Sequence, residues 1–294
     1  MAQPAGKRRL RTLLGTYPHT ASLKNRALTS DRIELDFTEF TPVWDGFDSM
    51  VRHHAFDVSE MAAVTYLAAM AHDKPMVLLP AAMFGRFQHP FAIYNADRGP
   101  MGPRDLEGKR VGVRAITTTT GAWLRGILAN DYGVDLDSIH WVTFEEAHVA
   151  ECEDHSTRAP QGKTIVQMLL DGELDAVLGE RSTDPRIRCL FGDADAEAVR
   201  WHRLRSVVPI NHLVVVSREL VETEPETVRE VYRLLREGKT TAGVPIANPD
   251  PIPFGIEKNR PALQLLADYA FQLGLVPRRY SVDEMFAPVR HLIS

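Results

Sequence analysis

Short apolar runs alternate with amphipathic stretches along nearly all of the 294-residue chain. This alternation is typical of an α/β protein with mainly parallel strands, because each apolar run fits a buried strand and each stretch of 3.6-residue spacing fits a covering helix. The predicted strands are 10–14, 33–37, 77–80, 110–113, 141–144, 176–178 and 212–216, and the predicted helices are 44–53, 61–71, 120–132, 164–171, 224–237 and 261–273.

Two segments predict a division of the chain into two lobes. Residues 96–114 form a Gly/Pro-rich turn that leads into a fresh strand–helix series, and residues 206–220 form a long extended run after a polar stretch. We therefore expect one discontinuous lobe, residues 1–92 with 211–294, and a second lobe, residues 93–210. The two extended segments would be hinge crossings, with a ligand cleft between the lobes.

Charge and cysteine content limit the classes of partner. A formal net charge of -5 gives no whole-protein field that attracts nucleic acid or an anionic membrane. Cys152 and Cys189 are too far apart for a disulfide framework. The basic start of the chain has an apolar part interrupted by Arg11, and no segment approaches about 20 apolar residues. We expect a cytoplasmic protein; homo-oligomer formation stays open.

Several strings resemble a known family. "DLEGKRVGV" and "LLDGELDAVL" are similar to the second lobe of type 2 periplasmic-binding-protein folds. "GTYPHTASLK", "FDVSEMAAVTYL", "GRFQHPFAIYN", "TTGAWLRGILANDYGVD", "WVTFEEAHVAE" and "VVPINHLVVV" resemble the 4,5-dihydroxyphthalate decarboxylase-like branch of that superfamily. These strings lie between about residue 15 and residue 237.

This resemblance implies a two-lobed fold of two mixed sheets flanked by helices. It also implies an enzyme that converts 4,5-dihydroxyphthalate to protocatechuate with release of carbon dioxide and without an organic cofactor. Two alternatives stay open. One is a non-catalytic solute-binding protein for a small carboxylate or other anion, and the other is a different enzyme on this fold, such as the menaquinone-pathway enzymes that act on chorismate-derived carboxylates.

A small-molecule aromatic dicarboxylate needs cationic and N–H donors, which we expect at the carboxyl ends of strands. Arg86, just before the first crossing, suits a carboxylate. His89 is a candidate proton donor, with an ordinary packing histidine as the alternative. Asn211 and His212 lie on the return crossing and would face the same space.

Two further segments of the first lobe carry candidates. His19 follows the first strand and is the titratable side chain there, so it joins His89 and His212 as a candidate for proton transfer, with roles that are interchangeable. Ser59 is expected to cap a helix with a hydroxyl that faces the ligand. Glu60 is either a first-turn charge or a site carboxylate.

In the second lobe Arg114 ends a strand and four threonines follow, Thr117, Thr118, Thr119 and Thr120. A cation beside a helix N-terminus suits a carboxylate or a phosphate. One threonine would cap the helix and the others would bind the anion. Glu180, after the strand 176–178, is a weaker candidate for the same site, as is its neighbour Arg181.

A metal site is the remaining alternative. Residues 145–155 carry glutamates, an aspartate and two histidines in a polar loop, but their spacing matches no metal motif, so we predict no metal. The chain also lacks GxSxG and P-loop motifs, which leaves nucleophilic hydrolysis and nucleotide chemistry without support.

Overall fold

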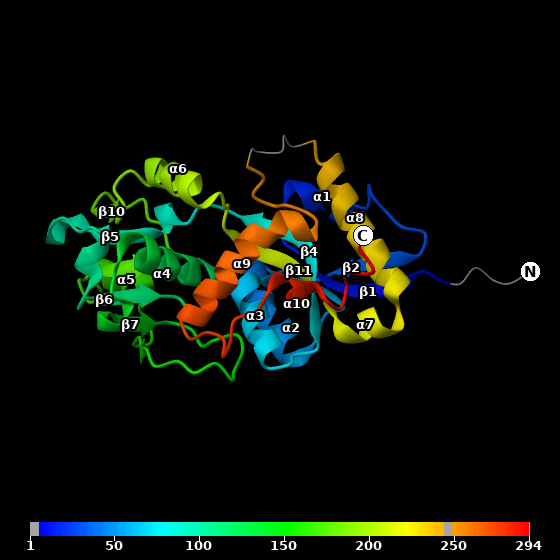
Figure 1. Ribbon diagram of the computed structural model, residues 1–294, viewed down its shortest axis with the longest axis horizontal. Helices are drawn as coiled ribbons and strands as arrows, with labels where there is room; N and C mark the ends of the chain where they lie inside the picture. The colour runs from blue at the N-terminus through cyan, green and yellow to red at the C-terminus, as the bar shows by residue number, and fades with distance from the viewer. Residues whose placement is uncertain (1–5, 244–248, 294) are drawn as a thin grey trace, which may run out of the picture. The chain divides into compact units, whose positions relative to one another are not determined.

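The computed structural model describes residues 6–243 and 249–293. Contacts between residues divide the chain into two compact units, shown with their elements labelled in Figure 1. The first unit contains residues 1–85, 210–264 and 280–294, and the second contains residues 86–209 and 265–279. The predicted lobe boundaries include residues 1–5, 244–248 and 294, which lie outside the described residues.

The first unit is built on a five-stranded mixed sheet in the order β2-β1-β3-β11-β4. β1 pairs in parallel with β2 and β3, while β11 runs antiparallel to β3 and β4. The strands are β1 (Arg8–Leu13), β2 (Ile33–Phe37), β3 (Val58–Ala62), β4 (Met76–Gly85) and β11 (Ile210–Ser217).

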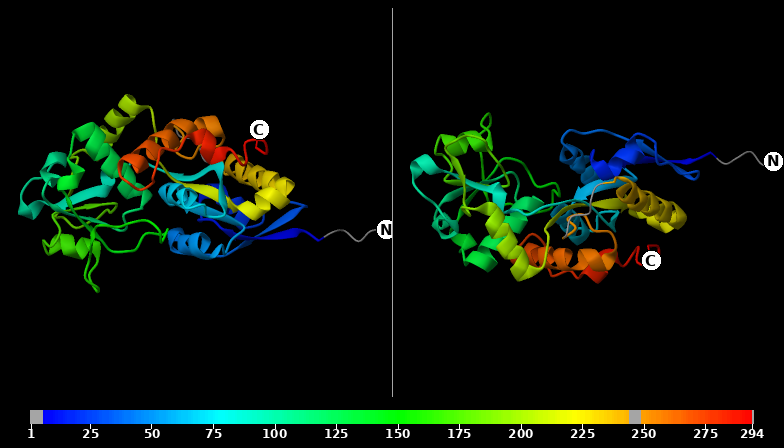
Figure 2. Two further views of the ribbon diagram at one scale, coloured as in Figure 1. Left: turned by 60° about the horizontal axis from the view of Figure 1, so that its bottom comes forward. Right: turned by 90° about the horizontal axis from the view of Figure 1, so that it is seen from above.

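The helices of this unit follow the apolar spacing of the sequence. They are α1 (Pro18–Lys24), α2 (Phe47–His53), α3 (Ala63–Ala71), α7 (Arg218–Thr223), α8 (Pro225–Thr241) and α10 (Val282–Phe286), with a 3-10 turn η1 (Val43–Gly46) before α2. α8 lies beside α1 (Figures 1 and 2). The helix predicted over 224–237 continues to Thr241 in the structure. A Cβ at Gly238 would lie 2.9 Å from the backbone oxygen of His19, so the glycine allows the two helices to approach closely.

The second unit is built on a six-stranded mixed sheet in the order β10-β5-β9-β6-β7-β8. β9, β6, β7 and β8 are parallel, whereas β5 is antiparallel to β9 and β10. The strands are β5 (Ala92–Asn95), β6 (Arg110–Val113), β7 (His140–Thr143), β8 (Thr157–Arg158), β9 (Ala176–Leu178) and β10 (Ile187–Cys189).

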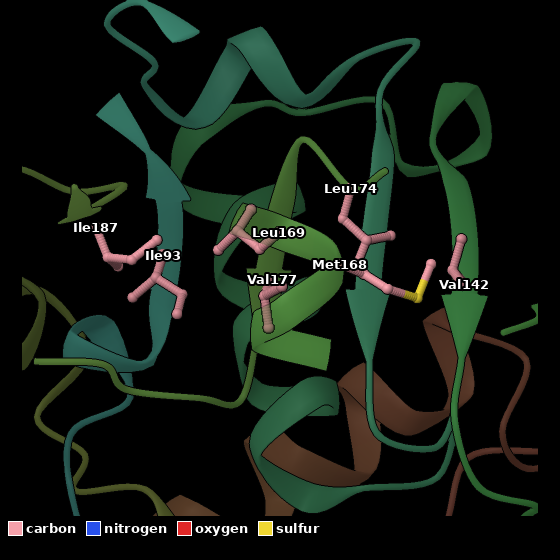
Figure 3. Packing of buried hydrophobic residues seen from close by; sticks show 7 residues of the cluster. All are labelled: Ile93, Val142, Met168, Leu169, Leu174, Val177 and Ile187. Carbon is pink, nitrogen blue, oxygen red and sulfur yellow. The ribbon is translucent and has the colours of Figure 1, made fainter. Parts of the chain in front are cut away.

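Three α-helices belong wholly to this unit: α4 (Thr119–Tyr132), α5 (Ile165–Leu170) and α6 (Ala194–Arg205). Four 3-10 turns accompany them, η2 (His89–Phe91), η3 (Ala96–Arg98), η4 (Pro103–Leu106) and η5 (Leu136–Ser138). Side chains of α5 pack over those of β5, β7, β9 and β10 (Figure 3). This core consists of Ile93, Val142, Met168, Leu169, Leu174, Val177 and Ile187.

Helix α9 (Ile256–Gln272) begins in the first unit, and its residues from 265 onward belong to the second. The sequence prediction placed this whole segment in the first lobe. The difference arises from a packing contact that periodicity does not reveal: the ring of Tyr269 lies 5.8 Å from that of Trp123 in α4, over Gly126, where a Cβ would collide with the tyrosine. The first boundary also lies at 85/86 rather than at 92/93.

Candidate functional site

In the first unit a buried carboxylate accepts hydrogen bonds from three donors. Glu60 lies in β3, whose carboxyl end is next to that of β1, and its side chain is fully buried. The carboxylate accepts hydrogen bonds from the Gly15 backbone N–H at 2.8 Å, the Tyr17 hydroxyl at 2.7 Å and Nδ1 of His212 at 2.7 Å. Of the two predicted roles for Glu60, a first-turn helix charge is therefore wrong, because the residue is within a strand.

The three donors decide the charge of this carboxyl group. Burial alone would favour the protonated form, but the hydrogen bonds from His212, Gly15 and Tyr17 and the charge of His212 outweigh it and hold the pKa of Glu60 below its usual range. Burial and the neighbouring Glu60 charge raise the pKa of the Tyr17 hydroxyl, which stays protonated and donates. Glu60 is thus a negative charge without access to solvent.

The contact with Glu60 also fixes the chemistry of His212. A carboxylate can only accept hydrogen bonds, so Nδ1 of His212 carries the proton and Nε2 is left for proton exchange. The imidazole is 8% exposed and lies between the rings of Phe47, 5.2 Å away at an interplanar angle of 83°, and Phe84, 5.5 Å away. A carboxylate that orients a histidine in an apolar setting is an arrangement used for general acid–base catalysis.

His19 belongs to the same cluster through Tyr17. Its ring is stacked on that of Tyr17, 5.0 Å away and nearly parallel at 3°, and its Nε2 is buried without a hydrogen-bond partner among the described residues. Burial lowers the pKa of His19. The structure thus brings His19, Tyr17, Glu60 and His212 together in one unit.

Ser59 and Asn211, two further residues predicted for the site, are not among the donors described for the Glu60 carboxylate. Ser59 does not cap a helix, because it lies inside β3, where side chains alternate, and it therefore points to the sheet face opposite Glu60. Its hydroxyl is buried and donates to the backbone oxygen of Glu60 at 2.7 Å. Asn211, next to His212 in β11, is also buried, at 2% exposed.

In the second unit the charged candidates lie at the carboxyl ends of adjacent parallel strands. Arg114 follows β6, Glu145 follows β7 and Glu180 follows β9, and these strands are neighbours in the order β9-β6-β7. Arg114 pairs with Glu145 at 3.4 Å. Burial raises the pKa of Glu180, an effect that the charge of Arg114 opposes. This edge of the sheet is the expected position of a ligand in an open α/β sheet.

Arg86 extends this charged edge over an aromatic ring. Its guanidinium carbon lies 3.5 Å from the ring centroid of Phe91, and that of Arg181 lies 4.8 Å from the same centroid. Phe91 immediately precedes β5, whose first residue pairs with the last residue of β9. Burial and the positive charge of Arg181 lower the pKa of Arg86 to about 10, so the group is a cation at neutral pH.

The threonines at 117–120 follow Arg114, which lies between β6 and α4, and their hydroxyls do not share one role. Thr118 is the N-terminal cap residue of α4, although its hydroxyl donates to the backbone oxygen of Ala115 at 3.0 Å and does not cap. Thr117 and Thr119 are buried, and the Thr117 hydroxyl has no partner within the described residues. Thr120 is half-buried in the first turn of α4.

Arg125 holds this turn in place. It donates through Nη2 to the backbone oxygen of Ile116 at 2.5 Å and through Nε to that of Gly121 at 3.3 Å, and it is 4% exposed. Burial lowers the pKa of Arg125 to about 10. Sequence reasoning missed this residue because an arginine within an amphipathic helix is ordinarily solvated.

His89 is fully buried in the core of the second unit. Its ring is therefore not accessible to a substrate, as the predicted role of proton donor requires. Its ring lies 5.0 Å from that of Phe191 and 6.0 Å from that of Trp201, and neither ring nitrogen has a partner among the described residues. Burial lowers the pKa of His89 to about 4. His89 belongs to the second unit, whereas His19, His212 and Glu60 belong to the first.

Side chains of the polar loop 145–155 contact neighbouring charged or polar groups. Glu145 pairs with Arg114, and His155 lies 3.5 Å from Glu153 with both side chains exposed. Within residues 6–243 and 249–293, no three side chains of the His, Cys, Asp or Glu type converge as a metal site would need. Each helix in that part of the chain is too short or too polar to span a bilayer.

Comparison with solved structures identifies the fold. The chain has the fold of the periplasmic binding proteins: it matches the periplasmic aliphatic sulphonate binding protein SsuA from Escherichia coli with a TM-score of 0.58, over 95% of this chain and 97% of that one, at 13% sequence identity. The predicted fold class, α/β with two mixed sheets, is confirmed. No family model matches the sequence.

Two curated relatives carry the name of the branch that the motifs resemble. The chain is 28% identical to the 4,5-dihydroxyphthalate decarboxylase of Comamonas testosteroni over 252 residues, 79% of this chain and 76% of the relative. It is also 28% identical to the 4,5-dihydroxyphthalate decarboxylase of Pseudomonas putida over 216 residues, 68% of this chain and 83% of that protein. The resemblance to this branch of the superfamily, inferred from the motifs, is confirmed.

Proposed function

We propose that the protein is a carboxy-lyase that removes one carboxylate from a hydroxylated aromatic dicarboxylate of the 4,5-dihydroxyphthalate type. The similarity to two proteins named as such decarboxylases supports the reaction class. The observation that carries the proposal is the buried contact between Glu60 and His212. A site that only binds an anion gains nothing from an ionised carboxylate, which repels the ligand, whereas a site that moves protons needs one to orient an imidazole.

The reaction requires three proton transfers. In 4,5-dihydroxyphthalate each hydroxyl is para to one carboxylate, so loss of the phenolic proton pushes an electron pair into the ring and a proton adds to the carbon that bears the departing group. The C–C bond then breaks, carbon dioxide leaves, and its electron pair restores the aromatic ring while the phenol regains its proton. Nε2 of His212 is the group that we assign to proton transfer, with Glu60 stabilising the imidazolium. Arg86 and Arg114 are assigned to the carboxylates.

Incubation with 4,5-dihydroxyphthalate tests this function, with carbon dioxide and protocatechuate measured together. We expect equal amounts of both from the wild type, and a rate lowered at least about 100-fold in His212→Ala. His53→Ala is the matched control, since His53 is exposed at the end of α2. Tight binding without turnover by the wild type would show a solute-binding protein instead, and an active His212→Ala variant would remove the assignment of the histidine.

A further inference from the structure

Two arginines share one aromatic ring in the second unit. The guanidinium carbons of Arg86 and Arg181 lie 3.5 Å and 4.8 Å from the centroid of the Phe91 ring. The distance between the two carbons therefore cannot exceed the sum of these two distances. Like charges at such a separation repel each other. None of the ion pairs within the described part of the chain includes Arg181. A pair of cations held together in this way is stabilised when an anion binds to both.

The surrounding backbone makes the position of the pair specific. Gly179 directly follows the last residue of β9, and Arg181 comes two residues after Gly179. The Gly179 N–H donates to the backbone oxygen of Phe91 at 2.7 Å. This bond joins the segment that carries Arg181 to the ring on which both cations lie. Because Phe91 is 9% exposed, its ring is a fixed platform rather than a mobile side chain.

We propose that Arg86 and Arg181, held on the ring of Phe91, form a subsite that selects dianionic aromatic substrates, with two neighbouring carboxylates, over monocarboxylates. The subsite rests on the proposed function, which supplies the substrate class. It adds Arg181 and Phe91 as residues that determine specificity. A single carboxylate neutralises one guanidinium and leaves the other repelled, whereas ortho carboxylates supply one negative charge to each. The neighbouring Glu180 disfavours a third anionic group.

Calorimetric titration with phthalate and with benzoate tests the subsite without any turnover, because neither compound has a phenolic hydroxyl. We expect the wild type to bind phthalate at least about tenfold more tightly than benzoate. Arg181→Ala should weaken phthalate binding about tenfold and leave benzoate within about twofold, while Arg181→Lys should recover part of the loss. Arg203→Ala is the matched control, since Arg203 is an exposed arginine of α6 in the same unit.

Equal weakening of both compounds in Arg181→Ala, or an unchanged affinity for phthalate, would overturn the subsite. Thermal melting of each variant shows whether it is folded. The outcome is separate from that of the proposed function: loss of the preference for phthalate with intact decarboxylation removes only the subsite, and a retained preference without decarboxylation removes only the reaction.

Discussion

The two units use the same edge of a sheet for different chemistry. In the first unit, the polar groups near the carboxyl ends of β1 and β3 are a buried carboxylate, a tyrosine and two histidines, linked by hydrogen bonds and ring stacking. In the second, the carboxyl ends of β6, β7 and β9 carry arginines and glutamates that are half-buried or exposed. One edge is suited to proton transfer and the other to the binding of anions.

This difference follows from how each sheet is covered. The rings of Phe47 and Phe84 contact that of His212, and Glu60 is fully buried. In a setting of low dielectric a fixed charge acts strongly on a neighbouring imidazole. Arg114 and Arg181 keep contact with solvent, so their charges are screened and contribute mainly attraction. Substitutions in the first unit should therefore change kcat, and substitutions in the second should change KM.

Glu60→Gln gives the largest expected effect. Glutamine keeps one accepting oxygen, but its NH2 group cannot accept, so it cannot serve all three donors, and the imidazole loses the negative charge that stabilises its protonated form. We expect kcat to fall about 10²- to 10⁴-fold with KM changed only a few-fold. Glu222→Gln, at an exposed site of α7, is the control. A loss confined to KM would break the comparison between the units.

His89 predicts the pH dependence of stability. Its pKa is lowered from 6.5 to about 4 by burial, so the unfolded chain takes up this proton as the pH falls through 6.5 while the folded chain does so only near pH 4. The free energy of unfolding should therefore decrease by up to about 3 kcal/mol between pH 6.5 and pH 4 through this residue. The contribution of His89 to the free energy of unfolding is fully present above pH 6.5.

Denaturant unfolding at several pH values measures that decrease. His89→Leu removes the titrating group and should flatten the dependence over this range, whereas His155→Leu, at an exposed site of the same unit, should leave it unchanged. If His89→Leu retained the wild-type slope and lost turnover by orders of magnitude, His89 would be an accessible proton donor, as first predicted, and proton transfer would not be confined to the first unit.

The strand–helix alternation was sufficient to predict an α/β fold, and the resemblance to the branch of the superfamily came from the sequence motifs. The strand 33–37 and the helix predicted over 120–132 lie where periodicity places them. Segments without a regular apolar pattern were missed: β3, whose five residues are all buried, and α6, whose exposed faces are highly charged. A strand buried on both faces shows no alternation, so Glu60 could not be assigned to it.

The candidate site could be predicted in composition but not in grouping. His212 and Glu60 are 152 positions apart in the sequence, and only the antiparallel pairing of β11 with β3 brings them together. Tyr17 could not be assigned a role from the sequence, because an aromatic beside a proline suggests a turn. Phe91 and Arg181 are joined by a ring contact for which no sequence spacing gives a signal.

Arg114→Ala gives a smaller effect, in the second unit. The loss of one charged hydrogen-bonding group from an anion site removes about 1.5–3 kcal/mol of binding, so KM for 4,5-dihydroxyphthalate should rise roughly 10- to 100-fold. We expect kcat to change less than KM, and Arg203→Ala to change neither. Steady-state kinetics separates the two constants, and a fall in kcat alone would place Arg114 with the proton-transfer groups.

Thr118→Val gives the smallest effect and tests the threonine turn. The Thr118 hydroxyl donates to the backbone oxygen of Ala115, so its removal should lower the free energy of unfolding by about 1 kcal/mol while KM stays within about twofold. Thr119→Val, in the first turn of α4, should instead raise KM several-fold if that hydroxyl contacts the anion. An unchanged KM in both variants would leave anion binding to the arginines and to the backbone N–H groups of α4, and the threonines would then serve only to shape the turn that Arg125 holds.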